Sequence, residues 1–185
     1  TFAISGAVLV LDVVNSADAL VANNAIINDP KAATDPVFAV TAAADQSVII
    51  SATTEATTFH LGGLTKLWDL QEFGVPGGTV GKVGIGGTYQ QVTLRSTADA
   101  HVADGVRIAA RDDVEITATN TVIVVAFTQQ GGDATKVGVS GAVSLLRLVT
   151  TAAAYVEGTA TIAAGGDLAV IATNDQVVVA VSAVL

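Results

Sequence analysis

The sequence predicts an all-β protein, a parallel β-helix (β-solenoid) built from imperfect 54-residue repeats with a short helical insertion. The segment Val137–Leu185 aligns without a gap on the segment 54 positions earlier, which places Gly141 on Gly87. Apolar residues make up 51% of the chain but only 4% is aromatic, so the core is expected to consist of small aliphatic side chains. Repetition at a fixed offset in a sequence rich in β-branched residues is typical of solenoids.

An alternation of two residues predicts which side chains face inward. In each copy one set of positions stays small and apolar while the positions between them vary, as a strand with one buried face requires. The inward positions predicted in this way are Ala98, Ala100, Val102, Val114, Ile116 and Ala118. The triplets Arg111–Asp113 and Gly165–Asp167 are then expected to form tight corners before a strand.

The repeats divide the chain into four parts: 1–60, 61–82, 83–136 and a truncated repeat at 137–185. The first part matches the third at an offset of 81 in its first half and 66 in its second half. The difference of 15 indicates an insertion near residues 23–39, which are rich in turn formers and contain two prolines, so a surface loop is expected. In the insertion 61–82, the apolar spacing of Leu64–Gly74 predicts a short helix.

A 54-residue unit is too long for one coil of a right-handed β-helix, so we expect two or three coils per repeat. At about 4.8 Å per coil, the chain would form a rod on the order of 40 Å long. Such a rod leaves open strand edges at both ends. A β-sandwich or a closed barrel stays open as an alternative, because strand periodicity does not fix topology.

Composition excludes several classes of function. A formal net charge of −9 argues against a nucleic-acid partner. No run of about 18 apolar residues occurs, so we expect no membrane insertion. The chain lacks cysteine, which rules out a disulfide framework but leaves secretion open. No signal peptide is visible at the start, and the last residues have strand-like sequence, so we expect a segment of a longer protein.

The repeat motifs are GVSGAV, TTAAAYVEG and TIAAGGDLAVIATN, all within residues 138–174. Their combination resembles the repeats of large bacterial surface proteins, the filamentous haemagglutinin and leukotoxin-like filamentous adhesins. The resemblance covers the three copies, whereas the insertion 61–82 and the variant IGGTYQQV depart from it. It implies a secreted, elongated β-solenoid at the cell surface or in an extracellular fibre.

Few residues suggest chemistry. Arg95, Thr97, Asp99 and His101 could share the outward face of one strand, and Asp–His pairs can serve acid–base catalysis. The other copies have Asp18 with Leu20, and Ala153 with Tyr155, at these two positions. They do not keep the Asp–His pair, and no nucleophile is evident nearby, so a solvated face is expected. His60 has no recognisable ligand partner, and we expect it at the surface or at a junction.

Two glycine-rich triplets, Gly131–Asp133 and Gly165–Asp167, invite comparison with calcium-binding turns. A single carboxylate falls short of the six to eight oxygen ligands that calcium takes, so ordinary tight turns are expected. We therefore expect no catalytic, cofactor-binding or metal-binding residue, and no cofactor.

The sequence thus predicts a non-enzymatic structural segment of a secreted bacterial surface adhesin or extracellular fibre. The alternative is a carbohydrate-binding or carbohydrate-processing β-helix, with a groove that uses Trp68, Tyr89 or Tyr155. The expected partners are neighbouring segments of the same protein or identical copies, joined by end-to-end strand stacking. Host or cell-surface glycans or proteins are further candidate partners, and nucleic acid is not.

Overall fold

The computed structural model describes residues 2–28, 47–62, 81–130 and 134–184, in which all regular elements are β-strands. Within these ranges, no helix is long and apolar enough to cross a membrane. The predicted all-β class is therefore confirmed for the described part of the chain, and the predicted helix Leu64–Gly74 lies outside it. The long strands are β1 (Phe2–Val21), β3 (Val48–Gly62), β4 (Gly81–Val102), β6 (Val114–Gln130), β7 (Ala134–Val156) and β9 (Leu168–Val184). The short strands are β2 (Ile26–Ile27), β5 (Arg107–Ala110) and β8 (Thr161–Ala164).

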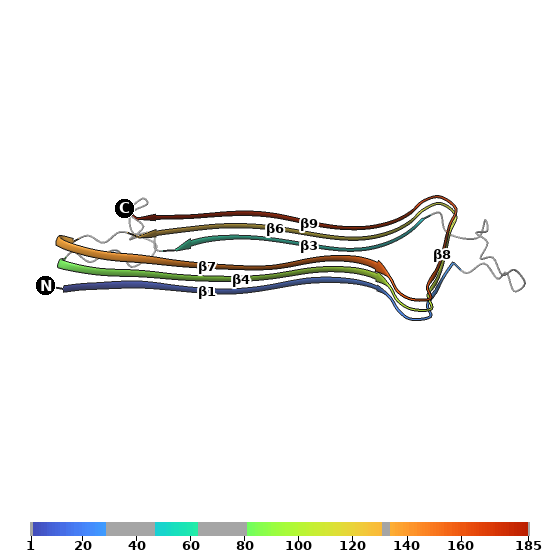
Figure 1. The fold of residues 1–185 in the computed structure, drawn as a ribbon, viewed down its shortest axis with the longest axis horizontal. Coiled ribbons are helices and arrows are strands. Elements are labelled where there is room, and N and C mark those ends of the chain that lie inside the picture. Colours follow the sequence, from blue (N-terminus) through green and yellow to red (C-terminus); the bar gives the residue numbers. More distant parts are fainter. Residues whose placement is uncertain (1, 29–46, 63–80, 131–133, 185) are drawn as a thin grey trace, which may run out of the picture.

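The strands form three parallel sheets with the orders β1-β4-β7, β2-β5-β8 and β3-β6-β9. The two sheets of long strands lie opposite each other, and the sheet of short strands joins them at one end of the molecule (Figure 1). We call β1–β3 layer 1, β4–β6 layer 2 and β7–β9 layer 3. Because each layer stacks in parallel on the one before it, the architecture is compatible with a β-helix or β-solenoid.

The layers stack residue on residue. Between layers 2 and 3, Gly87 lies opposite Gly141 in one long sheet and Ile116 lies opposite Val170 in the other. Between layers 1 and 2, Gly6 lies opposite Gly87. In parallel sheets, side chains at matching positions of neighbouring strands therefore form columns that run through the stack.

The expectation of two or three coils within a 54-residue unit is wrong, because Gly81–Gln130 forms a single layer. The long strands contain 15 to 23 residues, several times the usual five or six. At about 3.3 Å per residue, β4 is about 70 Å long, whereas three layers at about 4.8 Å span only about 10 Å between the outer strands. The long axis of the molecule thus follows the strands (Figure 1).

The loop expected near residues 23–39 also differs from the structure. Residues Ile26 and Ile27 form β2, which pairs in parallel with Arg107 and Ile108 of β5. A strand of two residues is too short to produce a period-two pattern, so it could not be predicted from periodicity. The remainder of the predicted loop, from residue 29 to residue 39, lies outside the described residues.

The inward phase predicted for layer 2 is confirmed. Layer 2 lies between two other layers, and its inner side chains are completely buried. Those with 0% exposure include Ala98, Ala100, Val102, Val114, Ile116 and Ala118. Layer 3 has a neighbour on one side only, so Val170, which lies opposite Ile116, is still 43% exposed. Burial in this fold therefore depends on how many layers cover a side chain.

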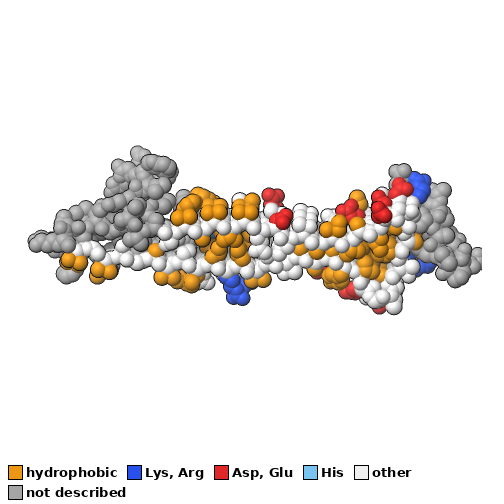
Figure 2. Space-filling model, turned by 45° about the horizontal axis from the view of Figure 1, so that its top comes forward, with side chains coloured by type: hydrophobic (Ala, Val, Ile, Leu, Met, Phe, Trp, Pro, Cys, Tyr) orange, Lys and Arg blue, Asp and Glu red, His pale blue; other side chains and the backbone are white. Residues whose placement is uncertain are grey.

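The core consists of two apolar clusters with a polar group between them. One cluster lies towards the short sheet and includes Ala100 and Ile116, and the other includes Leu94 and Val122. On the side of the molecule that carries β9, hydrophobic side chains likewise form two groups along the long axis (Figure 2).

The polar group consists of Thr54, Ser96 and Asn120, which are all buried. The hydroxyls of Thr54 and Ser96 donate to Asn120 Oδ1 at 3.0 and 2.7 Å. Asn120 Nδ2 donates to the carbonyl of Ser96 at 3.0 Å and to that of Thr151 in layer 3 at 3.2 Å. Layer 1 contributes Thr54, layer 2 contributes Ser96 and Asn120, and layer 3 contacts the group through the Thr151 carbonyl. We call Thr54, Ser96 and Asn120 the polar column.

Candidate functional site

Titratable and aromatic side chains gather near the ends of β1, β4 and β7. The register places Asp18 of β1 opposite Asp99 of β4, and it places His101 of β4 opposite Tyr155 of β7. Neighbouring strands of a sheet lie about 4.8 Å apart, so side chains at matching positions of the same face can touch. The parallel stacking of three layers thus assembles a group from residues far apart in sequence.

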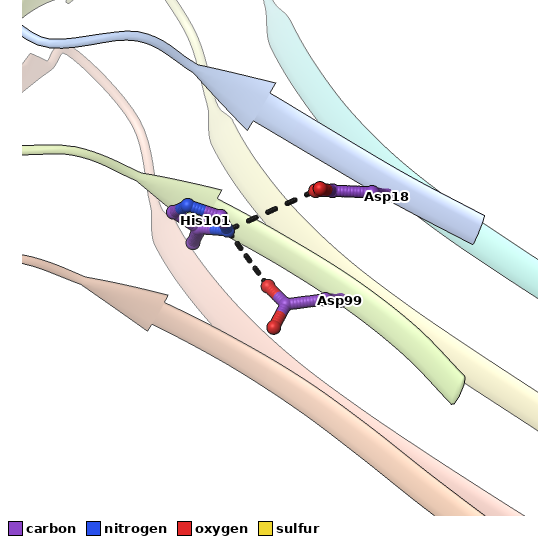
Figure 3. A group of neighbouring side chains, drawn as sticks. All are labelled: Asp18, Asp99 and His101. Carbon is purple, nitrogen blue, oxygen red and sulfur yellow. Dashed lines mark hydrogen bonds and ion pairs between the residues drawn. The ribbon is translucent and has the colours of Figure 1, made fainter. Parts of the chain in front are cut away.

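The group is centred on His101 (Figure 3). Its Nδ1 lies 2.7 Å from Asp99 Oδ1 and 3.9 Å from Asp18 Oδ1. The side chains of His101 and Asp99 are 17% and 29% exposed, whereas that of Asp18 is 66% exposed. We call these three residues the Asp–His cluster.

Tyr155 covers the imidazole of His101. The two rings are parallel within 2°, with their centroids 4.8 Å apart. Partial desolvation raises the pKa of Tyr155, and the negative charges of Asp99, Glu157 and Asp18 raise it further. The stacked ring fixes the plane of the imidazole, so Nδ1 stays directed at the carboxylates.

Two carboxylates and an imidazole are donor groups that zinc accepts, and one ligand atom from each lies within 4.8 Å of the others. Two ligands of one tetrahedral zinc, each about 2.0 Å from the ion, would be about 3.3 Å apart. The 2.7 Å separation of Nδ1 and Asp99 Oδ1 is instead that of a hydrogen bond. In its described geometry the cluster is a polar contact that ties β1 to β4.

Arg95, Thr97, Asp99 and His101 alternate with buried residues along β4, so they share its outward face as the sequence suggested. Asp99 and His101 are brought together, but Arg95 forms an ion pair with Asp12 of β1 at 3.3 Å. Asp18 was not singled out from the sequence. The alignment at an offset of 81 matches Asp18 with Asp99, and that match is the signal that could have found it.

His60 does not lie at the surface, because its side chain is buried. It lies near the end of β3, directly before the predicted insertion 61–82, so the junction that was the other expectation is not contradicted. It follows the inward phase of β3, in which Ala52, Thr54 and Ala56 are also buried. Burial lowers the pKa of His60 from its ordinary value of 6.5, and Nε2 is a buried atom without a hydrogen-bond partner among the described residues. The imidazole is therefore uncharged at neutral pH. A surface position was expected because His60 directly precedes the predicted insertion 61–82.

The predicted corners Arg111–Asp113 and Gly165–Asp167 are confirmed, since each directly precedes a long strand. Carboxylates at such corners bind the next layer: Asp113 Oδ1 accepts a hydrogen bond from the Asp167 amide at 2.8 Å, and Asp104 Oδ1 accepts one from the Thr159 amide at 2.6 Å. The hydrogen bonds from Thr159 lower the pKa of Asp104. The triplet at residues 131–133 lies outside the described residues.

The aromatic residues considered for a carbohydrate groove do not come together in the described structure. Tyr89 lies opposite Val143, which is twelve residues from Tyr155 on the same strand. At about 3.3 Å per residue, this separates the two tyrosines by about 40 Å along the sheet. Trp68 lies outside the described residues.

The fold and the Asp–His cluster define an all-β protein with parallel, in-register layers and a small polar group on one outward face. No family model, curated protein or solved structure matches the chain. Function is therefore inferred from the layers and from their exposed faces and edges.

Replacing His101 with alanine should lower the free energy of unfolding by about 1 kcal/mol. The change removes the hydrogen bond to Asp99 and the ring contact with Tyr155. It leaves Asp18 and Asp99 as like charges opposite each other on neighbouring strands. Urea denaturation would measure the loss, with Thr97→Ala on the same face as the control.

The wild type should have the same melting temperature in zinc chloride as in EDTA. The His101→Ala variant should also have the same melting temperature in both solutions. Stabilisation by zinc in the wild type that is lost in the variant would contradict this and would identify a metal site.

Proposed function

We propose that the chain is a non-catalytic structural segment, a β-solenoid of imperfect 54-residue repeats, in a secreted bacterial surface adhesin or extracellular fibre. The observation that carries this proposal is the stacking of three parallel layers whose outermost strands have no partner on one side among the residues that the structure describes. An architecture of this kind extends by adding layers, and it presents its outward side chains at a regular spacing.

The registers support the proposed repeat. Val83 lies opposite Val137, Arg107 opposite Thr161 and Val114 opposite Leu168, a difference of 54 in each of the three sheets. Between layers 1 and 2 the difference is 81 before residue 28 and 66 after residue 47. The sequence alignment gives the same offsets, so the 15 extra residues belong between β2 and β3.

Export and surface location are supported by the resemblance of GVSGAV and TIAAGGDLAVIATN to adhesin repeats. Many large aliphatic side chains face outward, among them Val8, Val10, Val143 and Leu145. Exposed apolar side chains at such density are typical of surfaces that contact another molecule. We therefore expect these outward side chains to bind another molecule, in addition to the structural role of the layers.

Antibodies raised against the purified chain should label intact, unpermeabilised cells of the source organism, on the surface or on shed fibres. Immunogold electron microscopy would make this measurement, with permeabilised cells as the reference for total protein. Labelling confined to permeabilised cells would contradict export.

A glycan array distinguishes the scaffold from the carbohydrate-binding alternative. The wild type and the Tyr155→Ala variant should give equal background signals. Binding that the substitution abolishes would favour a carbohydrate site.

A further inference from the structure

The outer face of layer 3 has the properties of an interface with a missing neighbour. Its inner side chains occupy the same columns as fully buried residues of layer 2, yet they remain accessible: Val156 is 37% exposed and Leu168 is 51% exposed, whereas Val102 and Val114 are 0% exposed. Among the described residues, the strands β7, β8 and β9 also have neighbours on one side only. One more layer would bury these side chains and pair these edges.

Layer 1 has the matching open edge at the opposite side of the stack. Within the part of the chain that the structure describes, β1 is paired with β4 only, and β3 with β6 only. Its inner positions Ala17, Ala19 and Val21 already pack against the core as layer 3 does with Ala152 and Ala154. Layer 1 is therefore chemically similar to the layer that the face of layer 3 lacks.

We propose that layer 3 of one copy of this chain binds layer 1 of a second copy, in the register that continues the existing columns. This inference rests on the proposed function and names the partner of the open edges as the same chain. A contact between different faces of identical molecules forms a ring when its rotation closes and a filament when it does not. Continuation of the existing columns adds each copy further along the stack, so repetition here produces a filament.

Charge complementarity specifies this register. The column Asp12–Thr93–Arg147 runs through β1, β4 and β7, so continuation places Asp12 of the second copy directly opposite Arg147. Both side chains are outward and exposed. Within one chain, Asp12 already binds Arg95 at 3.3 Å. Across the new boundary, Asp12 would therefore lie between two arginines, and opposite charges on neighbouring strands stabilise their pairing.

The polar column also continues across the proposed boundary. Asn120 donates to the carbonyl of Thr151 in the following layer. Asn174 lies opposite Asn120, is exposed, and donates to Thr150 Oγ1 within its own layer at 3.1 Å. The carbonyl that corresponds to Thr151 in a second copy is that of Ser16. Asn174 is thus in position to repeat the contact made by Asn120.

One pair opposes the contact. In the same register Glu55 of the second copy lies opposite Asp175, which places two carboxylates on neighbouring strands. Like charges at this spacing destabilise strand pairing. The proposed filament is therefore expected to dissociate at low concentration, and Glu55→Gln should strengthen it.

The test is a charge exchange between copies. Arg147→Glu places glutamate opposite Asp12 of the next copy, and Asp12→Lys places lysine opposite Arg147. Each variant alone should need about tenfold higher concentration to assemble, as expected from a change of about 1.4 kcal/mol. An equimolar mixture should assemble as the wild type does, because every boundary then pairs opposite charges. Sedimentation velocity over a concentration series measures this.

Arg111→Glu is the matched control for Arg147→Glu, since it changes the net charge by the same amount. Because Arg111 lies in layer 2, this control should assemble as the wild type does. Thermal melts precede the assays, and Arg147→Gln with Asp12→Asn replaces any variant that does not fold. With that neutral pair, each single variant should assemble more weakly than the wild type, and equal assembly would overturn the register.

Wild-type chain that remains monomeric at all concentrations would overturn the proposal, as would charge variants that assemble normally alone. Neither result bears on the proposed location of the protein at the cell surface, which immunogold labelling tests separately.

Discussion

Replacing Ala100 with aspartate should destabilise the chain by about 3 to 5 kcal/mol, enough to unfold a protein of ordinary stability. Ala100 is 0% exposed and lies between Ala19 of layer 1 and Ala154 of layer 3. A carboxylate at this position would be buried among methyl groups without a partner, and the layers 4.8 Å apart leave little room for it. Far-UV circular dichroism and urea denaturation would measure the effect.

The neighbouring position supplies the control. Asp99→Ala alters the adjacent, outward side chain and should cost less than about 1 kcal/mol. The same charge introduced at Val170, on the open face of layer 3, should have an intermediate effect, because that side chain is 43% exposed. Equal losses at Ala100 and Asp99 would contradict the inward phase of β4.

Replacing Asn120 with alanine should cost about 3 kcal/mol. The amide accepts from the buried hydroxyls of Thr54 and Ser96 and donates to the buried carbonyl of Ser96. It also donates to the carbonyl of Thr151, in a contact that is only partly buried. Its removal leaves these groups without that partner, and each unsatisfied buried group costs about 1 to 3 kcal/mol. The midpoint of urea denaturation is the measurement.

A triple variant separates lost hydrogen bonds from lost volume. Thr54→Val and Ser96→Ala remove the two buried hydroxyls, and Asn120→Leu fills the space of the amide with apolar atoms. Replacing both partners of a buried hydrogen bond by apolar groups can be nearly neutral, so the triple variant should regain most of the stability that Asn120→Ala loses. A triple variant no more stable than Asn120→Ala would show that the polar column does not act through its hydrogen bonds.

The all-β class and the inward phase of layer 2 could be predicted because both are local. An alternation such as Ala98, Ala100 and Val102 requires only that one face of a strand be buried. The corners at Arg111–Asp113 and Gly165–Asp167 were likewise predictable from the residues that turns need.

Features that depend on which strand lies against which were not predictable from the periodicity. The number of residues per layer was underestimated, because nothing in a period-two pattern states how far a strand continues before it turns. The interior position of Asn120 and Ser96 was missed, since polar residues on an inward face look like an interruption of the pattern. Asp18 became part of the Asp–His cluster only through the stacking of β1 on β4.

The great length of the strands relative to the thin stack has a mechanical consequence. Hydrogen bonds between these parallel strands are evenly spaced and slanted, and they run from layer to layer, mainly along the stack. Each boundary between layers is crossed by such bonds along nearly the whole length of two long strands. A tensile force along the stack would be shared by all of these bonds at once and would have to rupture them together. A force that lifts one end of an outer strand would load only the first few bonds and would peel the layer progressively. Material built from such layers would therefore resist stretching far better than peeling.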